Sequence, residues 1–281
     1  MAPDLQLAIA AMSLASLGLG MAAAVLSRRL EPGNRLIAVC IVVVLLATYA
    51  VIGQDAVWIA HLLPSPILPV TGQLMLPLTA VTLGLAWPAW QVPSWRKVSL
   101  TTACVALTLY TSWHRLRPNT IIYEDRWIGE VCLQSIDGTC SAAACATLLR
   151  AHGIHSSEER CGMLALTQRD GTTMYGMYRA LAVESAAAGF KPQVAMATLE
   201  DLHDERRLPA LLSVALDAET AEREPRYLTD WHWTIGQRHS VVLLGWVDDR
   251  PIIADPAIGR EVWHADGLAD LWIGRMLYLA R

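Results

Sequence analysis

The chain has 281 residues, a formal net charge of −4 at pH 7 and only 17% charged residues. Its mean hydropathy of +0.34 is high for a soluble enzyme and favours a protein with membrane-embedded segments. The mild charge provides no basic patch, which excludes a nucleic acid as an expected partner. No phosphate-binding loop of the form G-x-x-x-x-G-K-S/T occurs in these residues, which excludes a P-loop ATPase.

Four apolar segments in the first part of the chain are predicted to cross a membrane as helices. The first three have 18 to 22 residues, within the range of about 17–25 residues that crosses a hydrocarbon core of about 30 Å. The fourth reaches only about 24 Å at about 1.5 Å per residue. The segments are residues 5–26, 36–53, 69–90 and 98–113. Uncharged runs of this length would need burial on every face in a soluble protein. We therefore expect a multi-pass membrane domain over residues 1–120, with the lipid bilayer as a partner.

The basic residues between these segments predict how the chain is oriented in a cell membrane. They gather in the first and third connections: Arg28, Arg29, Arg35, Arg96 and Lys97. The positive-inside rule places both connections in the cytoplasm. With four spans the rest of the chain is extracytoplasmic, which is our expectation. It is cytoplasmic if residues 98–113 do not span, and Arg115 and Arg117 directly after that segment favour this second arrangement.

A candidate nucleophile follows the apolar region. Residues 134–154 predict a loop that leads into an Ala- and Leu-rich helix, with Cys140 at the start of the helix and Gly153 after its end. The positive end of the helix dipole and the unpaired N–H groups at a helix N-terminus favour a charged sulfur. We therefore predict that Cys140 is a reactive thiol.

A candidate base and acid lie near the end of the chain. Residues 238–246 and 251–255 are rich in β-branched side chains and are separated by a polar turn, which predicts a β-hairpin. His239 starts the first strand and Asp255 ends the second, so the hairpin can bring imidazole and carboxylate together. With Cys140, they supply the nucleophile, the base and the orienting group that a thiol hydrolase needs.

From Tyr123 to Arg281 the chain resembles the C39 peptidases, which are papain-like cysteine proteases that remove leader peptides from bacteriocins and related secreted peptides. Gln134 and Cys140 at the family's spacing carry the resemblance, together with the stretches that begin at His239 and Asp255. The resemblance implies an α+β papain-like domain over residues 123–281, with a helical half followed by an antiparallel sheet half. It also implies cleavage after a double glycine.

The resemblance implies a role for each of four residues. Cys140 is the nucleophile, His239 is the general base and then the general acid, and Asp255 orients the imidazole. Gln134 donates its side-chain amide to the oxyanion, beside the backbone N–H of Cys140. Ser141 departs from the pattern, because the family usually has glycine directly after the nucleophile.

The expected function is therefore a membrane-anchored cysteine endopeptidase that removes a leader or propeptide from a secreted peptide or protein precursor. Because these residues carry no ATPase, a separate export transporter is a further candidate partner. Two alternatives stay open. One is a catalytically silent C39-like module that holds a leader peptide, and the other is a thiol acyltransferase or amidase.

The remaining residues of the C-terminal region predict structure more than chemistry. No cofactor and no metal site are expected, because no C-x-x-C pair or Cys/His cluster has the spacing of zinc ligands. One disulfide could join two of Cys132, Cys145 and Cys161 in an oxidising compartment. The other histidines of this region, including His232, are interpreted as surface or core residues. The tryptophans, including Trp231 and Trp233, are interpreted as core residues, with the lining of a substrate groove as the alternative.

Overall fold

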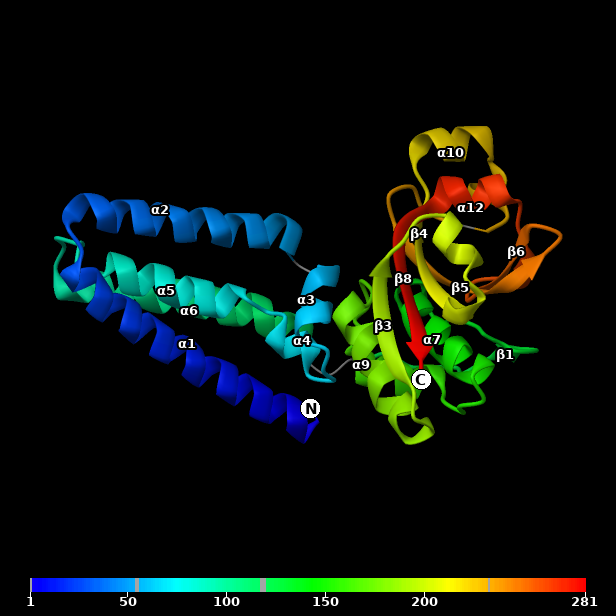
Figure 1. Ribbon diagram of the computed structural model, residues 1–281, viewed down its shortest axis with the longest axis horizontal. Helices are drawn as coiled ribbons and strands as arrows, with labels where there is room; N and C mark the ends of the chain where they lie inside the picture. The colour runs from blue at the N-terminus through cyan, green and yellow to red at the C-terminus, as the bar shows by residue number, and fades with distance from the viewer. Residues whose placement is uncertain (1, 54–55, 117–119, 232) are drawn as a thin grey trace. The chain divides into compact units, whose positions relative to one another are not determined.

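The computed structural model of the chain describes residues 2–53, 56–116, 120–231 and 233–281. It divides into two compact units (Figure 1). The first unit comprises Met1–Leu63 and Ile67–Arg117, and the second comprises Pro64–Pro66 and Pro118–Arg281.

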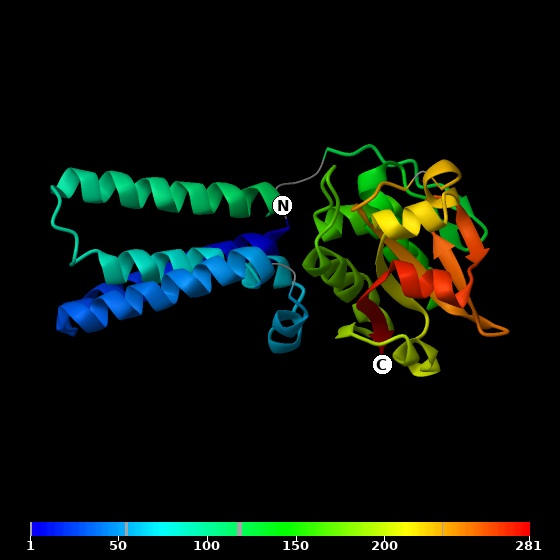
Figure 2. The same ribbon diagram turned by 90° about the horizontal axis from the view of Figure 1, so that it is seen from above.

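The first unit is helical over most of its described residues. Figures 1 and 2 show α1, α2, α5 and α6 as extended helices that run side by side. The helices are α1 Pro3–Arg29, α2 Pro32–Thr48, the π-helical η1 Tyr49–Gly53, α3 Val57–Leu62, α4 Leu68–Thr71, α5 Met75–Ala86 and α6 Ser94–Leu116. Proline at the first position of α1 and α2 fits the helix start, because its missing N–H would have no partner there.

Helices α1 and α5 approach closely because small residues line their contact. A Cβ atom added at Gly84 would overlap the carbonyl oxygen of Gly20, so both helices come together at backbone distance. The Ser27 hydroxyl donates a hydrogen bond of 2.6 Å to the carbonyl oxygen of Leu85. Small residues and interhelical hydrogen bonds of this kind hold helices together in lipid, where the hydrophobic effect does not.

Three helical segments are long and apolar enough to cross a membrane, judged by length and composition. They are Pro3–Arg29, Pro32–Val51 and Leu68–Ala86, which correspond to the first three predicted spans. Residues 98–113, the fourth predicted span, lie within α6, which is not among these segments in the described part of the chain. The fourth crossing therefore stays a prediction, and with it the side of the membrane. Arg117 lies outside the described residues.

The second unit has a helical half followed by an antiparallel sheet, as the sequence predicted. The helical half contains the short strands β1 Trp127–Ile128 and β2 Val131–Cys132, the 3₁₀ turn η2 Asp137–Thr139, and the helices α7 Cys140–Ala151, α8 Glu158–Ala165 and α9 Met174–Ser185. The sheet has six strands in the order β3-β8-β4-β5-β6-β7. They are β3 Lys191–Met196, β4 Ala210–Ala215, β5 Arg238–Val247, β6 Arg250–Asp255, β7 Gly259–Val262 and β8 Trp272–Ala280.

Short helices complete the sheet half, namely α10 Ala218–Arg223, α11 Arg226–Thr229 and α12 Ala265–Leu271, with the 3₁₀ turns η3 Ala186–Ala188, η4 Glu200–His203 and η5 Glu205–Arg207. Helix α7 packs against β4 and β5, and α9 packs against β3 and β8. Leu211 and Leu212 of β4 and Val241 and Val242 of β5 are all fully buried. Because successive strand residues point to opposite faces, the sheet is covered on both sides at its centre. The start of α7 is thereby held beside the start of β5.

Candidate active site

Cys140 begins α7, and the turn before it is closed by its own hydrogen bonds. The hydroxyl of Thr139 accepts the N–H groups of Ser135 and Ile136, each at 3.1 Å, and donates to the carbonyl oxygen of Ile136 at 2.8 Å. Gly138 lies so close to the carbonyl group of Arg169 that a Cβ atom would overlap it. These contacts fix the loop and place the sulfur at the helix N-terminus, as predicted.

Glu158 anchors the same loop from α8, although no sequence pattern marks it as a site residue. Its carboxylate is fully buried, accepts the N–H of Ser135 at 2.8 Å and also accepts the Ser135 hydroxyl. The N–H of Glu158 in turn donates to Asp125 at 2.8 Å. A buried carboxylate needs such partners to offset its lost hydration. In the sequence, Glu158 is an ordinary acidic residue in the first turn of a helix.

His239 and Asp255 lie together at the same end of the β5–β6 hairpin. The imidazole Nε2 is 2.7 Å from Oδ1 of Asp255, and the same oxygen accepts the N–H of Ala257 at 2.8 Å. Asp255 is fully buried. Because Nε2 is engaged by the carboxylate, Nδ1 is the ring nitrogen left to exchange a proton with a thiol.

The electrostatics of the site favour a thiolate beside an imidazolium. Burial by itself lowers the pKa of His239, but the charge of Asp255, its hydrogen bond and the contact with Cys140 raise that pKa to about 10. Burial raises the pKa of the Cys140 thiol, yet the hydrogen bond and charge of His239, with smaller contributions from Ser240 and Ser141, bring it below its ordinary value. The thiol therefore loses its proton at a lower pH than the imidazolium does, and the thiolate is the form of cysteine that acts as a nucleophile.

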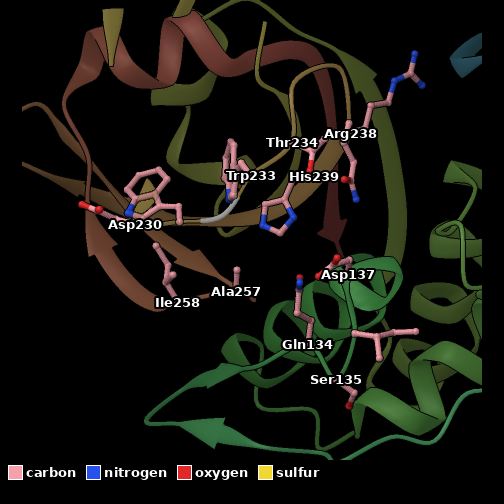
Figure 3. A pocket seen from close by; sticks show the side chains of 13 residues that line it. Gln134, Ser135, Asp137, Asp230, Trp233, Thr234, Arg238, His239, Ala257 and Ile258 are labelled. Atoms are coloured by element: carbon pink, nitrogen blue, oxygen red, sulfur yellow. The ribbon is translucent and has the colours of Figure 1, made fainter. Parts of the chain in front are cut away.

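Gln134 faces the imidazole from the opposite wall of a pocket. Its main-chain N–H donates to the carbonyl oxygen of Pro256 at 2.8 Å, and Figure 3 shows its side chain directed toward His239. The side-chain oxygen Oε1 is buried with no hydrogen-bond partner among the residues that the structure describes. The amide nitrogen end is therefore the end that faces the pocket.

The pocket between Gln134 and His239 has a volume of about 270 Å³. Trp233 forms part of its wall and packs against the imidazole, with ring centroids 4.9 Å apart and a tilt of 55°. Trp233 also belongs to the hydrophobic core of the sheet half, together with Trp231 and Trp263. Trp231 and Trp233 were predicted as core residues, and they also line this pocket. The lining residues are Gln134, Ser135, Ile136, Asp137, Asp230, Trp231, Trp233, Thr234, Gln237, Arg238, His239, Ala257 and Ile258 (Figure 3).

The other cysteines of the second unit are buried thiols. Cys132, Cys145 and Cys161 are all free in the described structure, without the disulfide that the sequence left open. Burial raises the pKa of each thiol, to about 12 for Cys161, so none resembles Cys140. The described residues contain no group of three or more His, Cys, Asp or Glu side chains that could hold a metal ion. His232 lies outside the described residues.

The sequence of the second unit matches a known protein family. The family model of the Peptidase C39 family matches residues 130–281. An uncharacterized protein of Methanothermobacter marburgensis is 34% identical over 149 residues, which cover 53% of this chain and 86% of that protein. An uncharacterized protein of Methanothermobacter thermautotrophicus is 27% identical over 152 residues, which cover 54% of this chain and 88% of that protein.

Solved structures with similarity to the chain include two peptidase domains of transporters. The peptidase domain of Streptococcus ComA, a bi-functional ABC transporter involved in a quorum sensing pathway, is 21% identical with a TM-score of 0.40, and the match covers 53% of this chain and 95% of that domain. A double glycine motif protease from an AMS/PCAT transporter, in complex with the leader peptide, is 20% identical with a TM-score of 0.39. That match covers 58% of this chain and 96% of the protease.

Proposed function

Because the chain belongs to the Peptidase C39 family, we propose that it is a membrane-anchored cysteine endopeptidase that removes a leader or propeptide from a secreted peptide or protein. The observation that carries the proposal is the juxtaposition of three groups. His239 is bonded to Asp255 at 2.7 Å, and both the charge and a hydrogen bond of the imidazole act on Cys140. Binding a peptide without cutting it would not need a thiol with a lowered pKa.

Nδ1 of His239 takes the proton of the Cys140 thiol before the first step, and in that step the Cys140 thiolate attacks the scissile carbonyl carbon. A carbon–sulfur bond forms and the carbonyl oxygen becomes an oxyanion. The side-chain amide of Gln134 and the backbone N–H of Cys140 are the proposed donors to this oxygen. Preorganised donors of this kind supply a large part of the rate of acyl transfer.

In the second step, the tetrahedral intermediate collapses and the carbon–nitrogen bond breaks. His239 gives its proton to the leaving amine, which departs as the new N-terminus of the product, and the leader stays on Cys140 as a thioester. A water molecule then gives a proton to His239 and attacks the thioester. The leader acid is released and the sulfur leaves as the thiolate.

Asp255 has the role of holding the imidazole in one orientation and one tautomer. Its Oδ1 accepts both the His239 Nε2–H and the N–H of Ala257, so the carboxylate is itself fixed by the backbone. With Nε2–H directed at Asp255, the lone pair of Nδ1 is directed to the thiol. The negative charge also stabilises the imidazolium that forms when Cys140 loses its proton.

The proposed substrate is a precursor cut after a double glycine, which is the site that C39 peptidases usually use. The membrane domain over residues 1–120 would keep the peptidase domain, residues 123–281, at the bilayer where exported precursors pass. Because these 281 residues contain no P-loop motif, we propose a separate export transporter as the source of the precursor.

The test is to incubate the full chain in detergent micelles with double-glycine precursor peptides in water enriched in ¹⁸O, and to weigh the products. Hydrolysis predicts a leader with ¹⁸O in its new carboxylate, and no product with Cys140→Ala. Another acceptor in place of water would identify an acyltransferase. Tight precursor binding with no cleavage by the wild-type chain would identify a binding module and contradict the proposal.

A further inference from the structure

The residue after Cys140 and the residue after His239 are in direct contact. The hydroxyl oxygens of Ser141 on α7 and Ser240 on β5 are 2.9 Å apart, although the two residues are 99 positions apart in sequence. Each serine is only 5% exposed, so water has little access to either hydroxyl. This contact joins the helix that carries the thiol to the strand that carries the imidazole.

Ser141 also lies beside the reactive sulfur. Its hydroxyl oxygen is 3.9 Å from Sγ of Cys140, which is long for a hydrogen bond but within the range for sulfur. The three atoms therefore form a line of contacts from Ser240 through Ser141 to Cys140. A hydroxyl has one proton to donate and can accept at the same time. If Ser240 donates to Ser141, the proton of Ser141 is free to point at the sulfur.

We propose that Ser141 and Ser240 are positioning residues of the peptidase, in which Ser240 orients the Ser141 hydroxyl and Ser141 donates its proton to the Cys140 thiolate. The proposal rests on the proposed function, because it assigns Cys140 as the nucleophile. A donor aimed at the charged sulfur stabilises the thiolate relative to the thiol, and the effect is strong where water is excluded. The same contact keeps α7 at a fixed distance from β5.

The contact depends on serine at position 141. Glycine, the residue that the family usually has after the nucleophile, carries no hydroxyl and could not make it. Sulfur contacts to Ser141 and to the backbone amide of Ser240 both act to lower the pKa of the thiol. This chain therefore has a stabilising group for the thiolate that is built from two serines, in addition to the imidazolium of His239.

The proposal is tested by the pH dependence of Cys140 alkylation with iodoacetamide, followed by peptide mapping so that only Cys140 is counted. The full chain in detergent micelles is used for each variant. Ser141→Ala and Ser141→Gly should both move the alkylation inflection upward by about one pH unit, the lower end for a hydrogen bond to a charged group. Ser141→Gly introduces the residue that is usual in the family at this position. We therefore expect this variant to fold, and its profile can be compared with that of the wild type even if Ser141→Ala does not fold.

The variants of Ser240 test the order of the contacts. Ser240→Ala should shift the inflection upward by less than Ser141→Ala does, and the double variant should shift it no further than Ser141→Ala alone. Ser185→Ala is the matched control, because it removes another fully buried hydroxyl that donates at 3.1 Å to the carbonyl of Phe190. It should leave the inflection of Cys140 unchanged.

Two results would overturn the proposal. If the pH profiles of Cys140 alkylation coincide for the wild type, Ser141→Ala and Ser141→Gly, Ser141 does not stabilise the thiolate. Fully additive shifts in the double variant would show that Ser240 does not act through Ser141. Failure of the proposed function is a different result, namely a wild-type inflection near the ordinary thiol pKa of about 8.5 together with no cleavage.

Discussion

The N–H of Gln134 donates a hydrogen bond of 2.8 Å to the carbonyl oxygen of Pro256, which joins the proposed oxyanion donor to the residue directly after Asp255. The helical half and the sheet half are thus connected at the site itself, by a backbone bond that does not depend on side-chain rotamers. A further backbone N–H, that of Ala257, holds the Asp255 carboxylate. The pocket walls are therefore fixed relative to each other before a substrate binds.

Replacing Asp255 with Asn should narrow the pH range of activity. Burial lowers the pKa of His239, but the charge and hydrogen bond of Asp255, together with the contact to Cys140, raise that pKa to about 10, so the imidazolium of the wild type persists up to that pH. As the pH increases, the activity of the wild type should rise when Cys140 loses its proton and should fall near pH 10, when His239 loses its proton. Asn removes the charge and leaves burial to lower the pKa, so the alkaline limb should move to lower pH, and kcat/KM should fall by about 10²-fold.

The measurement is the pH profile of kcat/KM for the wild type and Asp255→Asn. Asp266→Asn, on an exposed side chain of α12, is the matched control and should keep the wild-type profile. If the alkaline limb of Asp255→Asn stays near pH 10, Asp255 does not raise the pKa of His239 and the prediction is wrong.

Replacing Gln134 with Ala should lower kcat by about 10²-fold to 10³-fold with little change in KM, because an oxyanion donor acts mainly on the transition state. The rate of Cys140 alkylation should stay unchanged, since the thiolate does not depend on this amide. Steady-state kinetics and alkylation are measured on the same preparation. If the rate of Cys140 alkylation falls by the same factor as kcat, Gln134 maintains the structure of the site and is not an oxyanion donor.

Replacing Glu158 with Ala should destabilise the chain and disturb the nucleophile loop. The carboxylate accepts the N–H and hydroxyl groups of Ser135 in a fully buried position, and an unpartnered buried donor costs about 1–3 kcal/mol. We expect the free energy of unfolding to fall by about 2 kcal/mol in denaturant titration. Glu159→Ala, on the neighbouring exposed side chain, should change it by less than about 0.5 kcal/mol.

Adding a methyl group at Gly84 should separate α1 from α5. Its Cβ would meet the carbonyl of Gly20, whereas a Cβ at Gly18 on the same helix α1 meets nothing within 4 Å. Gly84→Ala should therefore lower the melting temperature in detergent and Gly18→Ala should not. Equal melting temperatures for the two variants would contradict the close approach of the helices.

The side of the membrane can be decided with reporters fused after Arg281. Four spans predict activity of a reporter that works only outside the cytoplasm. Activity of a cytoplasm-only reporter in its place would mean that residues 98–113 do not span. A second fusion would place the same reporter directly before residue 94, so that the fourth segment is absent. If residues 98–113 cross the membrane, this reporter should lie on the opposite side from the reporter fused after Arg281.

The sequence predicts those parts of the site that depend on neighbouring residues. The Ala- and Leu-rich run places Cys140 at a helix start, and two β-branched runs place His239 and Asp255 on one hairpin. The resemblance to the C39 peptidases predicts that Cys140 meets this hairpin, but the other contacts between distant segments could not be predicted. Ser141 stands out in the sequence only because the family usually has glycine there, Ser240 looks like an ordinary small polar residue, and Glu158 looks like a solvent-exposed helix start. Only the folded chain brings these groups into buried contact, since their partners lie 23 to 99 positions away.

Covalent labelling of the full chain with a peptide chloromethyl ketone that ends in Gly-Gly shows whether Cys140 is a nucleophile that depends on His239. We expect one label on Cys140 in the wild type, located by peptide mapping, and loss of most of the label in His239→Ala. Labelling of another cysteine, or a rate at Cys140 that is unchanged when His239 is removed, would contradict this expectation.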